Sequence, residues 1–155
     1  MKTGLVIFLV GASLAIAVVA VRAQDFGDTA TITQFQRAAD AYAFTHRQTD
    51  RRGTNPAELK EGAMFTPVVA AAFRVRIDAA LRAGCSAGAG DQFEVPRVNG
   101  PASGAAPVPP CIAAMLPRLP EELEYRISGV VLVLTDAHRL IVVDVLHGAF
   151  PRRDN

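Results

Sequence analysis

The last third of the chain carries the pattern that most restricts its fold. Residues 123–128, 130–135 and 140–146 are three runs rich in aliphatic, β-branched and aromatic side chains, separated by Gly129 and by the largely polar stretch 136–139. Short runs of this kind, bounded by turn residues, are typical of β-strands. Consecutive strands joined by tight turns pair antiparallel. The pattern therefore predicts a three-stranded antiparallel β-meander.

The hairpin 130–146 is apolar on both faces. In a register that pairs Thr135 with Leu140, one face is wholly apolar, and the other has only Thr135 and Asp144 as polar residues. An antiparallel sheet with one face in water usually alternates apolar and polar residues, so we expect the second face to be covered too. Three covers are open: the helices, the loop 85–110, or another subunit. The last would make the hairpin a contact for a homo-oligomer or a protein partner.

Two helices are predicted ahead of the strands. Apolar residues recur at three- and four-residue spacing over residues 28–50, and again over 67–83, where a Thr-Pro pair supplies a start signal. Gly84 is the expected stop of the second helix. An Asn-Pro start signal also predicts a short helix near 56–62. The many alanines favour a close antiparallel pair of the two main helices.

These elements predict an α+β fold. Two antiparallel helices are expected to pack on the C-terminal three-stranded antiparallel meander, with a long Gly/Pro-rich loop between them. Residues 24–155 are expected to form a single domain, with a helical half at 24–84, the loop at 85–116 and the meander at 117–151.

The N-terminal segment indicates export. Residues 4–21 carry no charge and follow a short basic start. Val21 and Ala23 place small residues where a signal peptidase that cuts after Ala23 requires them, so residues 1–23 are predicted to be a signal peptide. The apolar run is also about long enough to span a bilayer, and an uncleaved membrane anchor is the alternative. In both cases residues 24–155 are expected outside the inner membrane, periplasmic or secreted, because positive charge stays inside.

The two cysteines fit that compartment. Cys85 and Cys111 are the only cysteines of the chain, and an even count in an exported protein predicts a disulfide bond. The stretch between them is rich in Gly, Ala and Pro and has few residues to bury. A disulfide at its base would contribute about 3–4 kcal/mol. Two free buried thiols are the alternative.

Charge narrows the choice of partners. Loss of Lys2 and Arg22 with the segment 1–23 would turn the formal net charge of +1 into a small negative one. Nucleic-acid binders usually show a basic excess on one face, so we expect no nucleic-acid partner. Contact with a membrane is expected only through residues 4–21, if they are not cleaved.

The C-terminal part resembles a known kind of module. It has a Leu-Glu-Tyr-Arg strand at 123–126, then a glycine, an apolar strand, a turn centred on Asp136 and a Val-Asp-Val-Leu strand at 143–146. With the Phe-Thr-Pro segment at 65–67, the layout is similar to a family of uncharacterised small secreted bacterial proteins. The module 117–151 alone resembles the periplasmic nickel/cobalt-homeostasis protein family. The resemblance implies an exported α+β protein, and it carries no metal ligand over to this chain.

The first helix offers one group of chemistry-bearing residues. Tyr42, His46 and Asp50 follow each other at four-residue spacing, which places them on one face of the helix. A general base held by a carboxylate would look like this. A partly buried helix face with a hydrogen-bonded histidine would look the same, so both interpretations stay open.

The hairpin turn offers a second, weaker group. Asp136 and His138 lie two residues apart in the turn, and they are candidate metal ligands. His147 ends the last strand, roughly 20–30 Å from the turn by the rise of a strand, so it cannot share a metal with His138 within one chain. An incidental role for both histidines is the alternative.

Motifs for established chemistry do not occur in the sequence. It has no nucleophile elbow, HExxH, phosphate loop, GxGxxG or calcium loop. We therefore expect a non-catalytic binding or structural domain of the cell envelope, without a cofactor. The alternative hypotheses are a small periplasmic metal-homeostasis accessory protein, or a hydrolase that uses Tyr42, His46 and Asp50.

Overall fold

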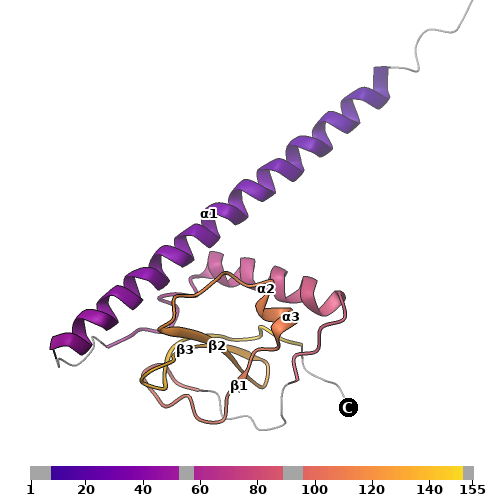
Figure 1. The fold of residues 1–155 in the computed structure, drawn as a ribbon. Helices are drawn as coiled ribbons and strands as arrows, with labels where there is room; N and C mark the ends of the chain where they lie inside the picture. The colour runs from indigo at the N-terminus through magenta and orange to yellow at the C-terminus, as the bar shows by residue number, and fades with distance from the viewer. Residues whose placement is uncertain (1–7, 53–57, 89–95, 152–155) are drawn as a thin grey trace, which may run out of the picture.

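The computed structural model describes residues 8–52, 58–88 and 96–151, with side chains from residue 28 onward (Figure 1). It shows an α+β fold with helices at one end of the chain and an antiparallel sheet at the other. The elements in chain order are α1 (Phe8–Arg52), α2 (Pro67–Arg82), β1 (Ala106–Pro107), α3 (Pro110–Ala113), β2 (Leu123–Ser128), β3 (Val131–Asp136) and β4 (Ile141–Leu146).

Helix α1 is longer than its apolar periodicity predicts. The helix expected at 28–50 lies inside a helix of 45 residues that begins at Phe8, and its N-terminal half extends beyond the sheet and α2 (Figure 1). No described helix is both long and apolar enough to cross a membrane. The predicted signal or anchor segment 1–23 lies partly outside the described residues.

Helix α2 begins and ends where its capping residues predict. The hydroxyl oxygen of Thr66 accepts a hydrogen bond from the backbone N–H of Val69, and Pro67 stands at the first helical position, where its missing N–H costs nothing. Gly84 follows the helix with a φ of +96°, a conformation that glycine adopts without strain. The short helix predicted at 56–62 is wrong over its described part, since residues 58–62 form irregular chain and a turn.

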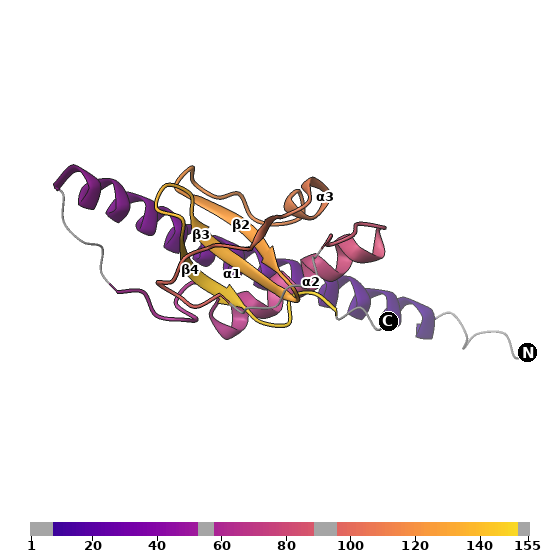
Figure 2. The same ribbon diagram turned by 90° about the horizontal axis from the view of Figure 1, so that it is seen from below.

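The two main helices run in roughly opposite directions, as both views show (Figures 1 and 2). Aromatic side chains join them to each other and to the sheet. The ring of Phe73 in α2 lies 4.8 Å from that of Phe35 in α1, 5.2 Å from that of Phe65 and 6.0 Å from that of Tyr125 in β2. Edge-to-face contacts at these distances are favourable beyond the area they bury.

The sheet has four strands in the order β1-β2-β3-β4, all antiparallel. The predicted count of three is therefore wrong. The additional strand, β1, consists of Ala106 and Pro107, which pair with Ile127 and Arg126 at the outer edge of β2. Two residues show no alternation of polar and apolar positions, so the sequence pattern could not reveal this strand.

The register of the β3–β4 hairpin also differs from the predicted one. Thr135 faces Val142 rather than Leu140, and Leu140 lies in the turn with a φ of +56°. A bulge between Leu134 and Thr135 then shifts the pairing, so that Leu134 faces Asp144. An extra residue in one strand reverses the faces of the residues beyond it, which places Val145 on the second face of the sheet rather than on the first.

The loop pairs with the outer edge of β4 and covers the second face of the hairpin through Val98 and Ala102. It is one of the three covers that the sequence leaves open. Asn99 and Ala102 donate backbone hydrogen bonds of 2.9 Å to Val142 and Leu140, and Val142 donates one of 2.8 Å to Gly100. Ala102 thereby packs against a valine cluster made of Val131, Val133, Val142 and Val145. The first face packs on both helices in the main core.

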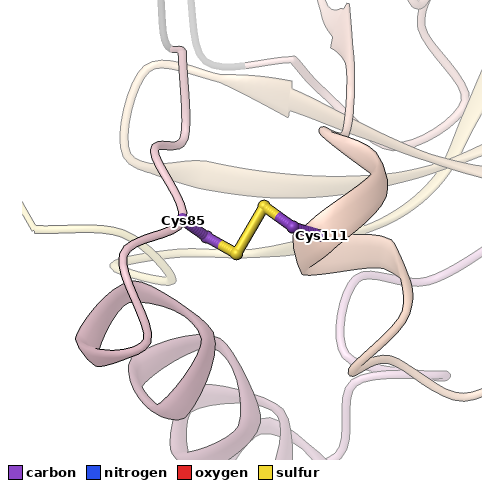
Figure 3. The surroundings of a disulfide bond; sticks show 2 residues. All are labelled: Cys85 and Cys111. Atoms are coloured by element: carbon purple, nitrogen blue, oxygen red, sulfur yellow. A yellow bond between two sulfur atoms is a disulfide. The ribbon is translucent and has the colours of Figure 1, made fainter.

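A disulfide bond closes this loop, as predicted (Figure 3). Cys85 follows the end of α2, Cys111 lies in α3, and their Cα atoms are 6.1 Å apart. The bond therefore joins the helical half of the chain to the start of the segment that leads into the sheet.

Asp144 ties the last strand to the loop that precedes α2. Its carboxylate is fully buried and accepts four backbone hydrogen bonds of 2.8 Å, from Gly62, Met64, Phe65 and Val145. An ionised carboxylate tolerates burial when its lone pairs are filled in this way. Asp144 therefore fixes the loop path that starts α2 over the sheet.

Candidate functional site

The structure brings the two groups of candidate residues together. Tyr42, His46 and Asp50 lie on one face of α1, and β3 ends against that face, so the hairpin turn places Asp136 and His138 beside it. We call these five side chains the polar cluster. The contact joins residues that lie 94 positions apart in the sequence.

Asp136 is the centre of the polar cluster and is completely buried. Its Oδ1 accepts backbone hydrogen bonds from His138 at 2.9 Å and from Arg139 at 2.8 Å. Asp side chains often hold turns in this way. Its Oδ2 points to α1, where the Tyr42 hydroxyl donates to it at 2.8 Å and the Nε2 atom of His46 lies 2.9 Å away. The same carboxylate thus shapes the turn and fixes it to the helix.

His46 lies between two carboxylates. The residue is only 3% exposed, with Nε2 beside Asp136 and Nδ1 3.2 Å from the Oδ2 of Asp50. Both contacts are close, but neither is aligned as a hydrogen bond. Both ring nitrogens therefore lack a hydrogen-bond partner among the described residues. An unpaired buried polar atom is costly, and such atoms are rare in native proteins.

Tyr42 keeps its proton. Burial raises the pKa of its phenol well above the usual 10, and the hydrogen bond to Asp136 and the negative charge of that carboxylate act in the same direction, while Arg139 opposes them. At neutral pH the Tyr42 hydroxyl is therefore a hydrogen-bond donor, not a phenolate nucleophile.

The outer part of the polar cluster is held by Arg139. Its guanidinium forms an ion pair with Asp50 and donates a hydrogen bond of 3.0 Å to the Thr49 hydroxyl. The side chain of Asp50 is 51% exposed, whereas His138 is exposed at the hairpin turn with its ring centre 5.5 Å from that of His46. The polar cluster thus extends from the buried carboxylate of Asp136 to a rim formed by the exposed side chains of Asp50 and His138.

The donor atoms are suited to a cation. One ligand atom each from His46, Asp136 and His138 lie within 4.8 Å of one another. Imidazole nitrogens with a carboxylate oxygen are a common ligand set for zinc and similar divalent ions. His147 is separate from this set, since its Nε2 contacts Glu61 at 3.0 Å.

The contacts of two residues near the polar cluster had no signal in the sequence. The sequence places Arg139 across the turn from Asp136, but its guanidinium pairs with Asp50 instead, a contact that depends on the tertiary fold. Glu122 belongs to an acidic run that is typical of a solvated edge, yet it is 1% exposed. One of its carboxylate oxygens contacts Arg47, and its backbone oxygen accepts from Ala137 in the turn at 2.9 Å.

No family model, curated protein or solved structure matches this chain. The resemblance of its C-terminal module to exported bacterial families therefore stays a hypothesis.

Proposed function

We propose that this protein is an exported, non-catalytic binding domain and that the polar cluster is its binding site. The observation that carries the proposal is the burial of His46 between Asp50 and Asp136, directly under the exposed His138.

The cost of this arrangement supports a binding role. Buried ionisable groups contribute little net stability, and apolar residues of similar size often do as well or better. Sequences that depart from the apolar-core rule do so mainly at functional sites. In the polar cluster, Asp136 departs from this rule, because it is a completely buried carboxylate. From Asp136 the polar side chains extend to the surface at His138.

The contacts within the polar cluster favour binding over catalysis. Tyr42 keeps its proton and donates a hydrogen bond to Asp136, so it does not act as a nucleophile at neutral pH. The Asp136 carboxylate accepts hydrogen bonds on both oxygens, so its orientation is fixed. Groups fixed in this way suit the recognition of a ligand better than proton transfer.

The disulfide supports export. Disulfides form and persist outside the reducing cytosol, and Cys111 lies at the surface, where cytosolic reductants would reach it. A periplasmic or secreted location is therefore part of the proposal.

Two measurements test this proposal. After expression of the full chain in a bacterium, fractionation should recover the protein from the periplasm or medium, with no free thiol in the denatured, unreduced sample. A thermal-shift screen with metal ions, phosphates, carboxylates and sugars should find a ligand class that stabilises the wild type but not the His138→Ala variant.

The His147→Ala variant is the matched control, because His147 is also an exposed histidine but lies outside the polar cluster. It should respond to the ligand as the wild type does. Recovery from the cytosol alone, or a screen without any ligand that depends on His138, would remove the proposal. Substrate turnover that is lost in His46→Gln would instead favour the hydrolase alternative.

A further inference from the structure

We infer that the polar cluster binds a divalent transition-metal ion through His46, Asp136 and His138. This inference rests on the proposed binding function and names its ligand. Zn²⁺ is the representative ion, because two imidazoles and one carboxylate form a familiar zinc ligand set.

The distances between the donor atoms suit such an ion. A tetrahedral zinc with bonds of 2.0–2.1 Å holds its ligand atoms about 3.4 Å apart. The Nε2 of His46 and the Oδ2 of Asp136 are 2.9 Å apart, and the three donor atoms lie within 4.8 Å of one another. Metal binding therefore requires that the Nε2 of His46 and the Oδ2 of Asp136 move slightly apart and that the side chain of His138 turns inward. The exposed position of His138 leaves room for that turn.

Asp136 is prepared to bind through one oxygen. Its Oδ1 is occupied by the backbone N–H groups of His138 and Arg139, so only Oδ2 faces the two imidazoles. The Tyr42 hydroxyl donates to that same oxygen. Ligating carboxylates are commonly held by such hydrogen bonds, which fix their orientation toward the metal.

Asp50 orients His46 in the manner of a metal site. Metal-binding histidines usually direct their second ring nitrogen to a carboxylate. Here the Nδ1 of His46 lies 3.2 Å from Asp50, and Asp50 is in turn held by Arg139. Binding of a metal through Nε2 would place the proton of His46 on Nδ1, on the side of Asp50. We therefore assign Asp50 as a positioning residue.

The ring nitrogens of His46 lack hydrogen-bond partners among the described residues, and this is a sign of a ligand that does not depend on the distances between the donor atoms. A histidine evolved only to pair with Asp136 would point an N–H at the carboxylate, but the Nε2 of His46 is 2.9 Å from Oδ2 without that alignment. A cation between the two imidazoles and Oδ2 would satisfy Nε2 with its lone pair. It would also offset the two negative charges that face His46, of which Arg139 balances only one.

Three protein ligands leave a coordination position open. Sites of this kind hold a water or an exchangeable ligand, whereas structural zinc sites have four protein ligands. The inferred site therefore has room for one exchangeable ligand on the metal.

Calorimetry of the full-length chain without an affinity tag, stripped with a chelator and titrated with Zn²⁺, tests the inference. We expect one ion per chain. The affinity should fall at least about tenfold in His138→Ala and about 10–100-fold in Asp50→Asn, since positioning carboxylates have effects of that size. The His147→Ala control should bind as the wild type does.

A second readout separates positioning from folding. Co²⁺ in place of Zn²⁺ should give the visible absorption of a tetrahedral site in the wild type, weakened in Asp50→Asn. Metal affinity should also fall on acidification, because protonated imidazoles do not bind metals, and Asp50→Asn should move this pH profile. The Asp50→Asn chain without metal should unfold at the same temperature as the wild type, within error.

The contrary results are distinct. No binding of Zn²⁺ by the wild type, or binding that survives in His138→Ala and is lost in His147→Ala, would overturn the metal site. If the wild type binds no metal but another ligand in the screen depends on His138, the binding function stands and only the metal fails. If neither occurs, both fail together.

Discussion

Tyr42 in α1 donates a hydrogen bond of 2.8 Å to the Oδ2 of Asp136, a residue 94 positions further along the chain. Because Asp136 also holds the hairpin turn through its Oδ1, this one bond fixes the turn relative to the helix. The spacing between His46 and His138 depends on it.

The alkaline limit of stability should follow from the two tyrosines, which are the only ones in the chain. Burial raises the pKa of both Tyr42 and Tyr125 above the usual 10. Above about pH 10 the unfolded chain loses phenolic protons that the folded chain keeps, so the free energy of unfolding falls as pH rises. Ultraviolet titration should show no tyrosine ionisation before unfolding begins. A folded chain in which either phenol ionises near pH 10 would contradict this prediction.

Asp144→Asn should destabilise the fold strongly. The amide keeps an acceptor oxygen but turns an NH₂ group toward backbone N–H donors, of which the carboxylate accepts four. We expect a loss of about 3 kcal/mol in the free energy of unfolding, measured in urea. Asp78→Asn is the control, because its exposed pair with Arg82 should matter by less than about 0.5 kcal/mol. Equal losses in the two variants would refute the role of Asp144.

Leu140→Gly should stabilise the protein. Leu140 has a φ of +56° and is 57% exposed, so it bears the strain of the left-handed region with little burial in return. Glycine removes a strain of about 1–2 kcal/mol at the cost of a more flexible unfolded chain, and we expect a net gain of about 0.5 kcal/mol. Leu140→Ala keeps the Cβ and serves as the control. A Gly variant no more stable than the Ala variant would count against the strained turn.

Replacement of both Cys85 and Cys111 by Ser should cost about 3–4 kcal/mol in urea unfolding. The loss of stability should be greatest in the loop segment that covers the valine cluster, because the disulfide closes the loop to which this segment belongs. Hydrogen exchange at Asn99 and Ala102, whose N–H groups bond to the hairpin, should accelerate more than exchange in α2. Uniform acceleration throughout the chain would show that the loop is not held by the bond.

The sequence predicts most of the elements because they are local. The start and stop of α2 follow from Thr66, Pro67 and Gly84, and the three long strands follow from runs of β-formers. The hairpin register could not be predicted, because a bulge at Leu134 and Thr135 depends on what the strands pack against. Strand β1 could not be predicted either, because its pairing with β2 is decided by the path of the loop.

The polar cluster could be predicted only in halves. Helical spacing groups Tyr42, His46 and Asp50, and the turn groups Asp136 with His138. Nothing local indicates that the turn lies against the C-terminal end of α1, because that contact is made by packing between the helix and the sheet. The ion pair of Arg139 with Asp50 could not be predicted for the same reason.

Asp144 also limits when folding can finish. The loop 61–65 finds its acceptor only in β4, 79 to 82 positions further along the chain. Until that strand arrives, the backbone N–H groups that start α2 have no carboxylate to bind, and the helical half cannot take its final path. Multistep folding of this kind leaves apolar surface exposed in the meantime. A ribosome stalled before residue 144 would therefore hold an unfinished protein.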